Sequence, residues 1–385
     1  MCEVRKSDVA IVGAGPAGSM AARELARAGV RVALIDGSYP REKPCGGGVT
    51  GRALELARLA APAAAPARAI DRVTFEASNR RAAVELTSQH DLRVFSRDGF
   101  DTALLSEAAN AGAALTRARV NAIARHHGAW TITAGSTIVR APWLLGADGA
   151  GGVVRKRVFR PFARAQLSVA AGSYVDGVET SEIVIAFVDR PSGYLWSFPR
   201  PGHLAVGACA QADETTPAAM HAVTDAWLDR YAPAAGRPRR RYAWPIPSLR
   251  AADIDAERPS GDGWMLLGDA AGLVDPITRE GIFFALRSGL LAARALQSSR
   301  PAGAYASAVR DELHGELRRA ARLKAGFYRP RFTRLLVDAL GESRAVRGVM
   351  VDLIAGRQPY AGLKRRLLGT LEIGLMVRLV RAGST

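Results

Sequence analysis

The sequence is poor in residues that bind metals or cross-link a chain. It has only three cysteines, Cys2, Cys45 and Cys209, with no CxxC pair among them, and its six histidines form no HxxxH pattern. Structural zinc sites and disulfide frameworks both depend on such spacings. We therefore expect no metal site and no disulfide, and a cytoplasmic location.

Long apolar runs are also lacking. No uninterrupted apolar stretch reaches the roughly 18 residues that a membrane-spanning helix requires, and Met1 to Lys6 is polar. This pattern predicts no spanning helix and no secretory signal. The composition, 48% hydrophobic and 23% charged over 385 residues, is that of a globular protein with two or three domains or one elaborated enzyme.

Acidic residues are scarce relative to basic ones. The formal net charge is +17, and from Arg310 onward 16 basic residues outnumber 7 acidic ones, a net of +9. Such an excess attracts nucleic acid, anionic membrane or a phosphorylated substrate, or it reflects an ordinary arginine-rich surface. Because no nucleic-acid motif is present, we expect no nucleic-acid partner.

The C-terminal segment adds a second reason to consider lipid. Leucines recur there at four-residue spacing beside cations, a pattern typical of a basic amphipathic helix in a membrane interface. The residues are Leu363, Leu367, Leu371 and Leu375, with Lys364, Arg365 and Arg366. A core helix covered by surface arginines explains the same pattern, so peripheral contact with anionic membrane stays one of two open interpretations.

A glycine-rich turn near the N-terminus joins apolar segments. Residues 8–12 and 30–35 have the pattern of buried strands, and residues 17–28 that of an Ala-rich helix. The turn between the first strand and the helix, residues 13–18, reads GAGPAG, and Asp36 follows the second strand. A GxGxxG turn between strand and helix, with an acid about 20 residues later, predicts a dinucleotide site.

Each residue of this motif has a physical role in such a site. Gly13 permits the tight turn, Gly15 lets a pyrophosphate approach the backbone, and Gly18 lets the helix pack on the strand. The helix that begins at Ala17 would direct its N-terminus at the phosphates. Asp36 would accept hydrogen bonds from ribose hydroxyls.

Further motifs follow in the order expected for one FAD molecule. Arg97 begins a predicted helix and could reach the pyrophosphate or the flavin edge. Asp148 and Gly149 lie in a GADG turn after the apolar strand 143–145, and Asp269, in GDAAG, could bind the ribityl hydroxyls. Each motif is weak alone, but together they predict an FAD site.

A helix predicted from Gly281 and Ile282 to Leu296 completes the cofactor motifs. If its N-terminus points at the pyrimidine edge of the flavin, the helix dipole would stabilise the negative charge of reduced flavin. That arrangement would favour a hydride donor.

The order of these motifs predicts an α/β fold with a Rossmann-like FAD-binding domain, an inserted mixed β-sheet substrate domain and a helical C-terminal region. The FAD domain is expected to be discontinuous, residues 1–165 and 255–300. Four β-type runs place the substrate sheet in residues 166–254, and the helical region covers 301–385. Within these parts, 61–69 is predicted to be a loop, and 244–247 is a proline-rich stretch.

With these residues in place, the chain resembles FAD-dependent oxidoreductases of the p-hydroxybenzoate hydroxylase superfamily, and within it the geranylgeranyl reductase family. The likeness rests on residues 43–48 (KPCGGG), residues 194–199 (YLWSFP) with Gly207, and Asp275-Pro276 followed by 280–282 (EGI). Members of this family saturate isolated double bonds of isoprenoid chains in prenylated pigments, archaeal-type lipids or menaquinone. The resemblance implies an FAD-dependent reductase with a hydrophobic small-molecule substrate, and it does not choose among these.

The resemblance also implies roles for single residues. Gly47 and Gly48 would approach the flavin, and Cys45 in the same loop is a candidate proton donor or substrate-positioning group. Tyr194 and Trp196 alternate on one strand and would stack against the prenyl chain. Ordinary loop and core positions are the alternatives for these three candidate catalytic residues.

Two positions depart from the family pattern. Arg279 stands where the family usually has a glycine beside Glu280, which adds a positive charge to the flavin loop. Gly151-Gly152 follows the GADG turn where a serine is common, which is expected to loosen that turn.

The electron donor and the reaction class stay open. Only one GxGxxG is present, so NAD(P)H would have to bind transiently at the flavin, and a ferredoxin-type redox protein is the alternative donor. An FAD-dependent monooxygenase or halogenase acting on an aromatic natural product is the second candidate function, because the superfamily motifs are shared. A flavin-binding redox sensor is a third.

Overall fold

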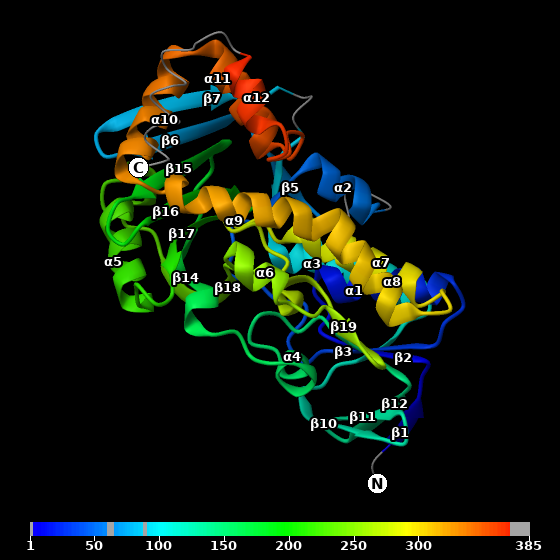
Figure 1. Cartoon of the computed structure of the whole chain (residues 1–385). Coiled ribbons are helices and arrows are strands. Elements are labelled where there is room, and N and C mark those ends of the chain that lie inside the picture. Colours follow the sequence, from blue (N-terminus) through cyan, green and yellow to red (C-terminus); the bar gives the residue numbers. More distant parts are fainter. Residues whose placement is uncertain (1–2, 60–64, 88–90, 370–385) are drawn as a thin grey trace.

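The computed structural model describes residues 3–59, 65–87 and 91–369, which form two large sheets with helices around them (Figure 1). The first sheet has six strands, and every neighbouring pair is parallel except the one formed by β19 and β20. In spatial order they are β19 (Ser260–Gly261), β20 (Trp264–Leu266), β13 (Trp143–Gly146), β2 (Val9–Val12), β3 (Val32–Ile35) and β9 (Ala114–Thr116).

Helix α1 (Pro16–Arg27) connects β2 to β3 and follows directly from the sequence. Pro16 suits the first helical turn, where its missing N–H has no partner to lose. Gly29, with φ +79°, takes the left-handed conformation that commonly ends a helix. All four residues of β2 and of β3 are buried, as expected for strands covered on both faces.

The second sheet has seven strands and is mixed, since β15 and β6 are parallel while its other pairs are antiparallel. Its order is β18 (Arg239–Pro247), β14 (Leu167–Asp176), β17 (His203–Gln211), β16 (Gly193–Arg200), β15 (Glu182–Val188), β6 (Arg72–Ala77) and β7 (Arg80–Glu85). The predicted division at residue 165 assigns β6 and β7 to the cofactor domain, whereas their pairing makes them part of this second sheet.

Two smaller sheets complete the strands. One has the order β1 (Glu3–Lys6), β12 (Thr137–Ala141), β11 (Ala129–Ala134) and β10 (Val120–His126). The other consists of β4 (Gly48–Val49), β8 (Arg93–Phe95) and β5 (Ala67–Ala69). The last strand corrects the loop predicted for 61–69, because residues 67–69 pair with β8.

The proline-rich stretch 244–247, to which the sequence assigns no strand, forms part of a strand. These residues are the end of β18, which lies at the edge of its sheet and pairs only with β14 within the described part of the chain. An edge strand has one side without a ladder partner, so prolines such as Pro245 and Pro247 are tolerated there.

Some of the remaining helices connect the strands, and others follow the last strand. The connecting helices are α2 (Gly51–Ala57), α3 (Arg97–Asn110), α4 (Val153–Val158), α5 (Pro217–Leu228) and α6 (Ala251–Asp255). The later ones are α7 (Ile282–Ala295), α8 (Pro301–Val309), α9 (Gly315–Phe327), α10 (Pro330–Glu342), α11 (Arg344–Ile354) and α12 (Leu363–Leu368). The predicted helical C-terminal region is confirmed for the residues described.

Helices α10 and α11 cover the end of the second sheet (Figure 1). Leu336 and Leu340 of α10 and Met350 of α11 belong to one buried apolar cluster with Val73 and Phe75 of β6. Residues far apart in the chain therefore enclose one apolar region.

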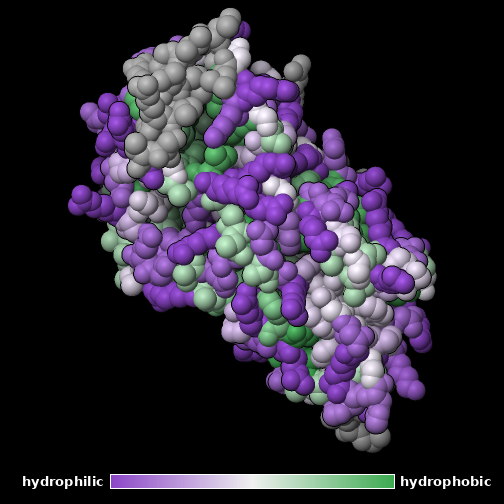
Figure 2. Space-filling view, in the orientation of Figure 1, coloured by the Kyte–Doolittle hydropathy of each residue, from purple (hydrophilic) through white to green (hydrophobic). Residues whose placement is uncertain are grey.

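The face of the molecule in Figure 2 is mainly hydrophilic, with apolar residues in small separate areas. Within residues 3–59, 65–87 and 91–369, no helix combines the length and apolarity needed to cross a bilayer.

Candidate active site

A cavity of about 640 Å³ lies at the carboxyl ends of β2, β3 and β13. Ligands of open parallel sheets bind at this edge. Seven of the predicted cofactor residues line the cavity: Gly13, Gly15, Ala17, Asp36, Asp148, Gly149 and Asp269.

Two glycines of the first motif lie so close to other backbone atoms that a side chain there would clash. Gly13 has φ +104°, and a Cβ there would lie 2.3 Å from the carbonyl oxygen of Ala147. A Cβ on Gly18 would lie 1.9 Å from the carbonyl oxygen of Gly13. Gly18 is not among the cavity-lining residues, so its position serves close packing of α1 on the turn. Gly15, the N-cap of α1, makes no side-chain cap, which leaves the helix N-terminus open to a ligand.

Two acids of this cavity, Asp36 and Asp148, differ in the hydrogen bonds that their carboxylate oxygens accept. Asp36 accepts hydrogen bonds from the backbone N–H groups of Ala14 (2.9 Å) and Ser38 (2.7 Å). Oδ2 of Asp148 accepts one from Val154 N (3.0 Å), whereas its Oδ1 is buried without a hydrogen-bond partner among the described residues. Burial raises the pKa of Asp148 to about 6. A buried oxygen with no partner, at the edge of this cavity, fits a ligand that carries hydroxyl groups, as FAD does.

The lack of a side chain at Gly152 makes room for the carboxylate of Asp148. A Cβ at Gly152 would lie 2.2 Å from Asp148 Oδ1. The departure Gly151-Gly152, expected to loosen the turn, thus lets the carboxylate fold back onto the start of α4.

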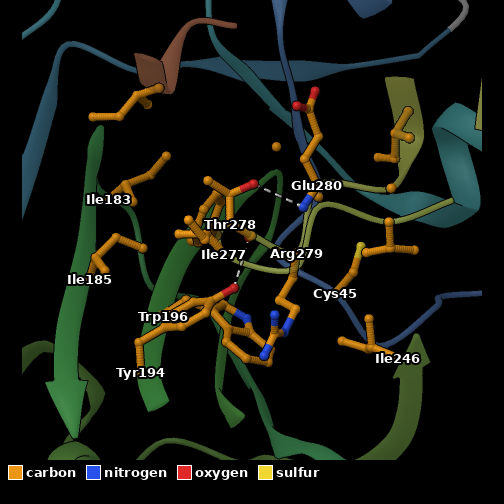
Figure 3. Close-up of a pocket in the computed structure, with 18 of the residues that line it drawn as sticks. Cys45, Ile183, Ile185, Tyr194, Trp196, Ile246, Ile277, Thr278, Arg279 and Glu280 are labelled. Atoms are coloured by element: carbon orange, nitrogen blue, oxygen red, sulfur yellow. Dashed lines mark hydrogen bonds between the residues drawn. The ribbon is translucent and has the colours of Figure 1, made fainter. Parts of the chain in front are cut away.

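A second cavity of about 280 Å³ adjoins the first, and the two share the lining residues Pro16, Lys43, Trp244, Asp269 and Ala285. Its wall is largely apolar and comes from β15, β16, β18 and the C-terminal helices (Figure 3). It collects the remaining predicted residues except Gly18, namely Cys45, Gly47, Gly48, Arg97, Tyr194, Trp196, Gly281 and Ile282.

Cys45 sits between two arginines. Its Sγ lies 3.4 Å from Arg97 Nη1 and 3.5 Å from Arg200 Nη2. Arg200, at the end of β16, is fully buried and also donates to the carbonyl oxygens of Cys45 and Gly46 (3.2 Å to Gly46). Its Nη1 pairs with Glu42. Arg200 therefore fixes the loop that carries Cys45.

Arg97 forms an ion pair with Asp101, a residue of the same helix. Its Nε and Nη2 donate to the two oxygens of Asp101 at 2.9 and 2.8 Å, and both residues are buried. Burial alone would lower the pKa of Arg97, but the attraction of Asp101 raises it well above its ordinary value. Arg97 lines the apolar cavity and is not among the residues that line the dinucleotide cavity.

Gly47 and Gly48 bring backbone close to neighbouring groups. Gly47 has φ +83°, and a Cβ there would lie 2.3 Å from the carbonyl oxygen of Phe95. A Cβ on Gly48 would lie 2.9 Å from the ring of Phe198. The loop can take this course only with glycine at Gly47.

Tyr194 and Trp196 form a buried aromatic wall, 8% and 4% exposed. The Tyr194 ring is parallel to that of Tyr328, with centroids 6.1 Å apart. The Tyr194 hydroxyl donates to the carbonyl oxygen of Thr278 (2.9 Å), and the Tyr328 hydroxyl donates to that of Ile277. The two phenols thus hold the segment before α7, and burial raises the pKa of both.

Ion pairs fix the acids at the junction of the cavities. Lys43 Nζ lies 3.1 Å from Asp269 Oδ2, and Arg52 pairs with Glu280, which also accepts from Thr50 Oγ1 at 3.1 Å. Gly281, the N-cap of α7, has no side-chain cap and lines the cavity, so the N-terminus of α7 is open to it.

Comparison with known families agrees with this geometry. Residues 6–298 match the family described as FAD binding domain. The chain belongs to this family. It is an FAD-dependent oxidoreductase of the geranylgeranyl reductase-like type.

Several named proteins are similar to this oxidoreductase. A menaquinone reductase of Mycolicibacterium smegmatis is 31% identical over 76% of this chain and 77% of its own. A digeranylgeranylglycerophospholipid reductase of Methanothrix thermoacetophila is 29% identical over 84% of this chain and 88% of its own.

Solved structures share the fold. A geranylgeranyl bacteriochlorophyll reductase-like protein from Thermoplasma acidophilum has a TM-score of 0.79 at 22% identity, covering 95% of this chain and 100% of its own. The flavin-dependent brominase Bmp2 has a TM-score of 0.69 at 21% identity, covering 95% and 99%. Likeness at this level of identity concerns the fold alone.

Sequence reasoning missed two residues that organise the oxidoreductase's site. Tyr328 lies at the end of α9, and nothing in the local pattern joins it to Tyr194. Arg200 follows the YLWSFP segment directly, so an arginine at the end of an apolar strand was a signal that could have been used.

Proposed function

We propose that this FAD-dependent oxidoreductase saturates carbon–carbon double bonds of an isoprenoid chain. The observation that carries the proposal is the apolar cavity that adjoins the dinucleotide cavity, with Cys45 on its wall. Aliphatic side chains of β15 and α11, Ile183, Ile185, Leu353 and Ile354, offer the contacts that an isoprenoid tail prefers. The names of the relatives support prenyl substrates without selecting one.

The residues of the first cavity would hold FAD. The open N-terminus of α1 would face the pyrophosphate, and Asp36 and Asp148 would accept hydrogen bonds from hydroxyl groups. Gly281 and Ile282 would present the N-terminus of α7 to the flavin ring. When bound, FAD supplies the hydride for the reaction.

Saturation of a double bond adds a hydride to one carbon and a proton to the other. We assign the proton to the thiol of Cys45, since this group is half-buried on the cavity wall. Arg97 and Arg200 direct N–H groups at its sulfur and would stabilise the thiolate left after proton transfer. Tyr194 and Trp196 would exclude water and press on the chain.

The reductant and the location belong to the same proposal. NAD(P)H or a ferredoxin-type protein would reduce the flavin. Because the sequence has a single GxGxxG motif, NAD(P)H would bind transiently at the flavin rather than at a second dinucleotide site.

The net charge of +17 favours peripheral contact with anionic membrane, where prenyl lipids reside.

Anaerobic turnover tests the proposal. The purified protein, reduced chemically, is mixed with geranylgeranyl diphosphate, a prenylated glycerophospholipid or menaquinone, and the products are analysed by mass spectrometry. A product heavier by two hydrogens per reduced bond is expected. Oxygen or halogen transferred to an aromatic compound in air, with no reduced prenyl product, would establish the monooxygenase or halogenase alternative.

A further inference from the structure

Arg279 occupies an unusual backbone position on the wall of the apolar cavity. Its φ is +59°, a left-handed conformation that costs energy for a residue with a side chain. The side chain extends away from Glu280, toward the strands that carry Trp196 and Ile246 (Figure 3). This backbone conformation suits glycine better than arginine. A function of the arginine's positive charge would offset the strain.

That charge has no counter-ion among the described residues. Arg279 Nη2 donates to Ser168 Oγ at 2.9 Å, and the guanidinium interacts with the Cys209 thiol. Its Nε and Nη1 are buried and make no further hydrogen bond in the part of the chain that the structure describes. Among those residues no carboxylate lies within ion-pair distance, in contrast to Arg97 with its bidentate partner Asp101. A buried guanidinium without a partner is costly unless a ligand neutralises it.

One thiol and two phenols around Arg279 are neutral at neutral pH. Burial raises the pKa of the Cys209 thiol and of the Tyr194 and Tyr328 phenols. Asp275 is a weaker electrostatic neighbour. Its Oδ1 already accepts hydrogen bonds from Ile277 N (2.7 Å), Thr278 N (2.9 Å) and the Tyr360 hydroxyl (3.2 Å).

A basic side chain, Lys324, lies near Arg279. Lys324 Nζ donates to Gln211 Oε1 (2.5 Å) and Ser248 Oγ (2.6 Å), both neutral, and Gln211 is the cross-strand partner of Ser168, which binds Arg279. Burial and the charge of Arg279 lower the pKa of Lys324 to about 7. Lys324 is therefore only partly protonated at neutral pH, and Arg279 carries most of the positive charge that the described residues place at this end of the cavity.

We infer that Arg279, supported by Lys324, binds the phosphoryl anion of a prenyl substrate, so that the enzyme selects phosphorylated isoprenoids over neutral prenyl alcohols and quinones. This inference rests on the proposed function for the identity of the tail. The free N–H groups of a guanidinium suit two phosphoryl oxygens, and the exclusion of water strengthens each contact. The apolar wall receives the chain, and the cation fixes which end of it enters first.

Ligand binding to the FAD-loaded enzyme tests this inference without turnover. Isothermal titration compares geranylgeranyl diphosphate with geranylgeraniol in the parent and in Arg279→Gly. The parent should bind the diphosphate more tightly, and the variant should lose about 10- to 100-fold in affinity for it, since a charge-assisted hydrogen bond contributes about 1.5–3 kcal/mol. Affinity for the alcohol should change little.

The chain offers good controls. Glycine accepts the φ of +59°, so Arg279→Gly should keep its FAD content and melting temperature. Arg322→Gln removes the same charge from the exposed face of α9, two residues from Lys324, and should leave the affinity for diphosphate unchanged. A prenylated glycerophosphate, titrated in parallel, shows whether the phosphoryl group comes from a free diphosphate or from a lipid headgroup.

The outcomes separate the two proposals. Equal affinity of the parent for alcohol and diphosphate, or an equal loss of both in Arg279→Gly, would overturn the anion site and leave the prenyl cavity standing. Failure of the parent to bind either ligand would overturn the proposed function as well.

Discussion

At the scale of the residue, the site depends on side chains held by charged partners. Cys45 receives N–H groups from Arg97 and Arg200, so the position of its sulfur is set by the α3 and β16 contacts rather than by its own loop. Such a thiol is oriented before a substrate arrives.

The first prediction is that Cys45→Ser keeps FAD but lowers the rate of product formation on the order of 10²-fold, the effect of losing an acid–base group. Anaerobic single-turnover rates measure it. Cys209→Ala is the control, because Cys209 is a buried thiol that is not among the residues lining either cavity. A Cys45→Ser enzyme as fast as the parent would make Cys45 a structural residue.

A second prediction concerns Lys324 and pH. Burial and Arg279, helped by Arg250 and opposed by Cys209 and Glu214, lower its pKa from 10.5 to about 7. Between these values the unfolded state binds more protons than the folded state, so this lysine adds stability as pH rises from about 7 and withdraws it as pH falls.

Lys324→Gln lacks this dependence. The difference in free energy of unfolding, parent minus variant, should therefore increase between about pH 7 and pH 10 in urea titrations. A difference that stays flat over this range would show that the lysine is charged in the folded protein.

Residue-scale contacts are also where sequence reasoning was weakest. The glycines and Asp148 were predictable because each belongs to a local motif with a physical function. Tyr328 was not, since its partners lie far away in the chain and only the folded structure brings them together. Arg200 offered one local signal, its place at the end of an apolar strand, but its contacts with residues 42–46 are also distant in the sequence.

At the scale of the element, the loop from Lys43 to Gly48 is the most constrained part of the site. Gly47→Ala should destabilise the FAD-saturated enzyme by about 1–3 kcal/mol, because its φ is left-handed and its Cβ would overlap the Phe95 carbonyl. Gly303→Ala, in α8 with nothing within 4 Å of its Cβ, should be neutral or stabilising. Equal melting temperatures for the two variants would contradict this view of the loop.

Elements with strong patterns were predicted well from the sequence. The unit β2–α1–β3 was found within two residues, because apolar strands and an Ala-rich helix are separated by glycines. The end of β18 was missed, since proline argues against a strand unless the strand is known to be an edge, and edges are a property of the whole sheet.

At the scale of the whole molecule, the predicted fold class is confirmed: an FAD-binding-domain fold with a mixed second sheet and a helical C-terminal region. The predicted boundaries stay a prediction. The pairing of β6 with β15 shows why they are hard to place, because parallel partners from distant segments leave no local signal.

The membrane prediction concerns a segment that the structure describes only as far as residue 369. Leu367 packs partly buried against the cluster under α10 and α11, whereas Leu371 and Leu375 lie beyond the described part of the chain. The first observation favours the core interpretation for the start of this segment, and peripheral contact with lipid stays a prediction.

The central claim is that the two adjoining cavities couple FAD to an isoprenoid double bond. Its most direct test is a stoichiometric, oxygen-free reaction of the reduced enzyme with geranylgeranyl diphosphate, in which flavin absorbance and product mass are followed together. We predict that one flavin is oxidised for each double bond saturated. A flavin that stays reduced with prenyl substrates, yet is oxidised in air with oxygen appearing in an aromatic product, would contradict the claim.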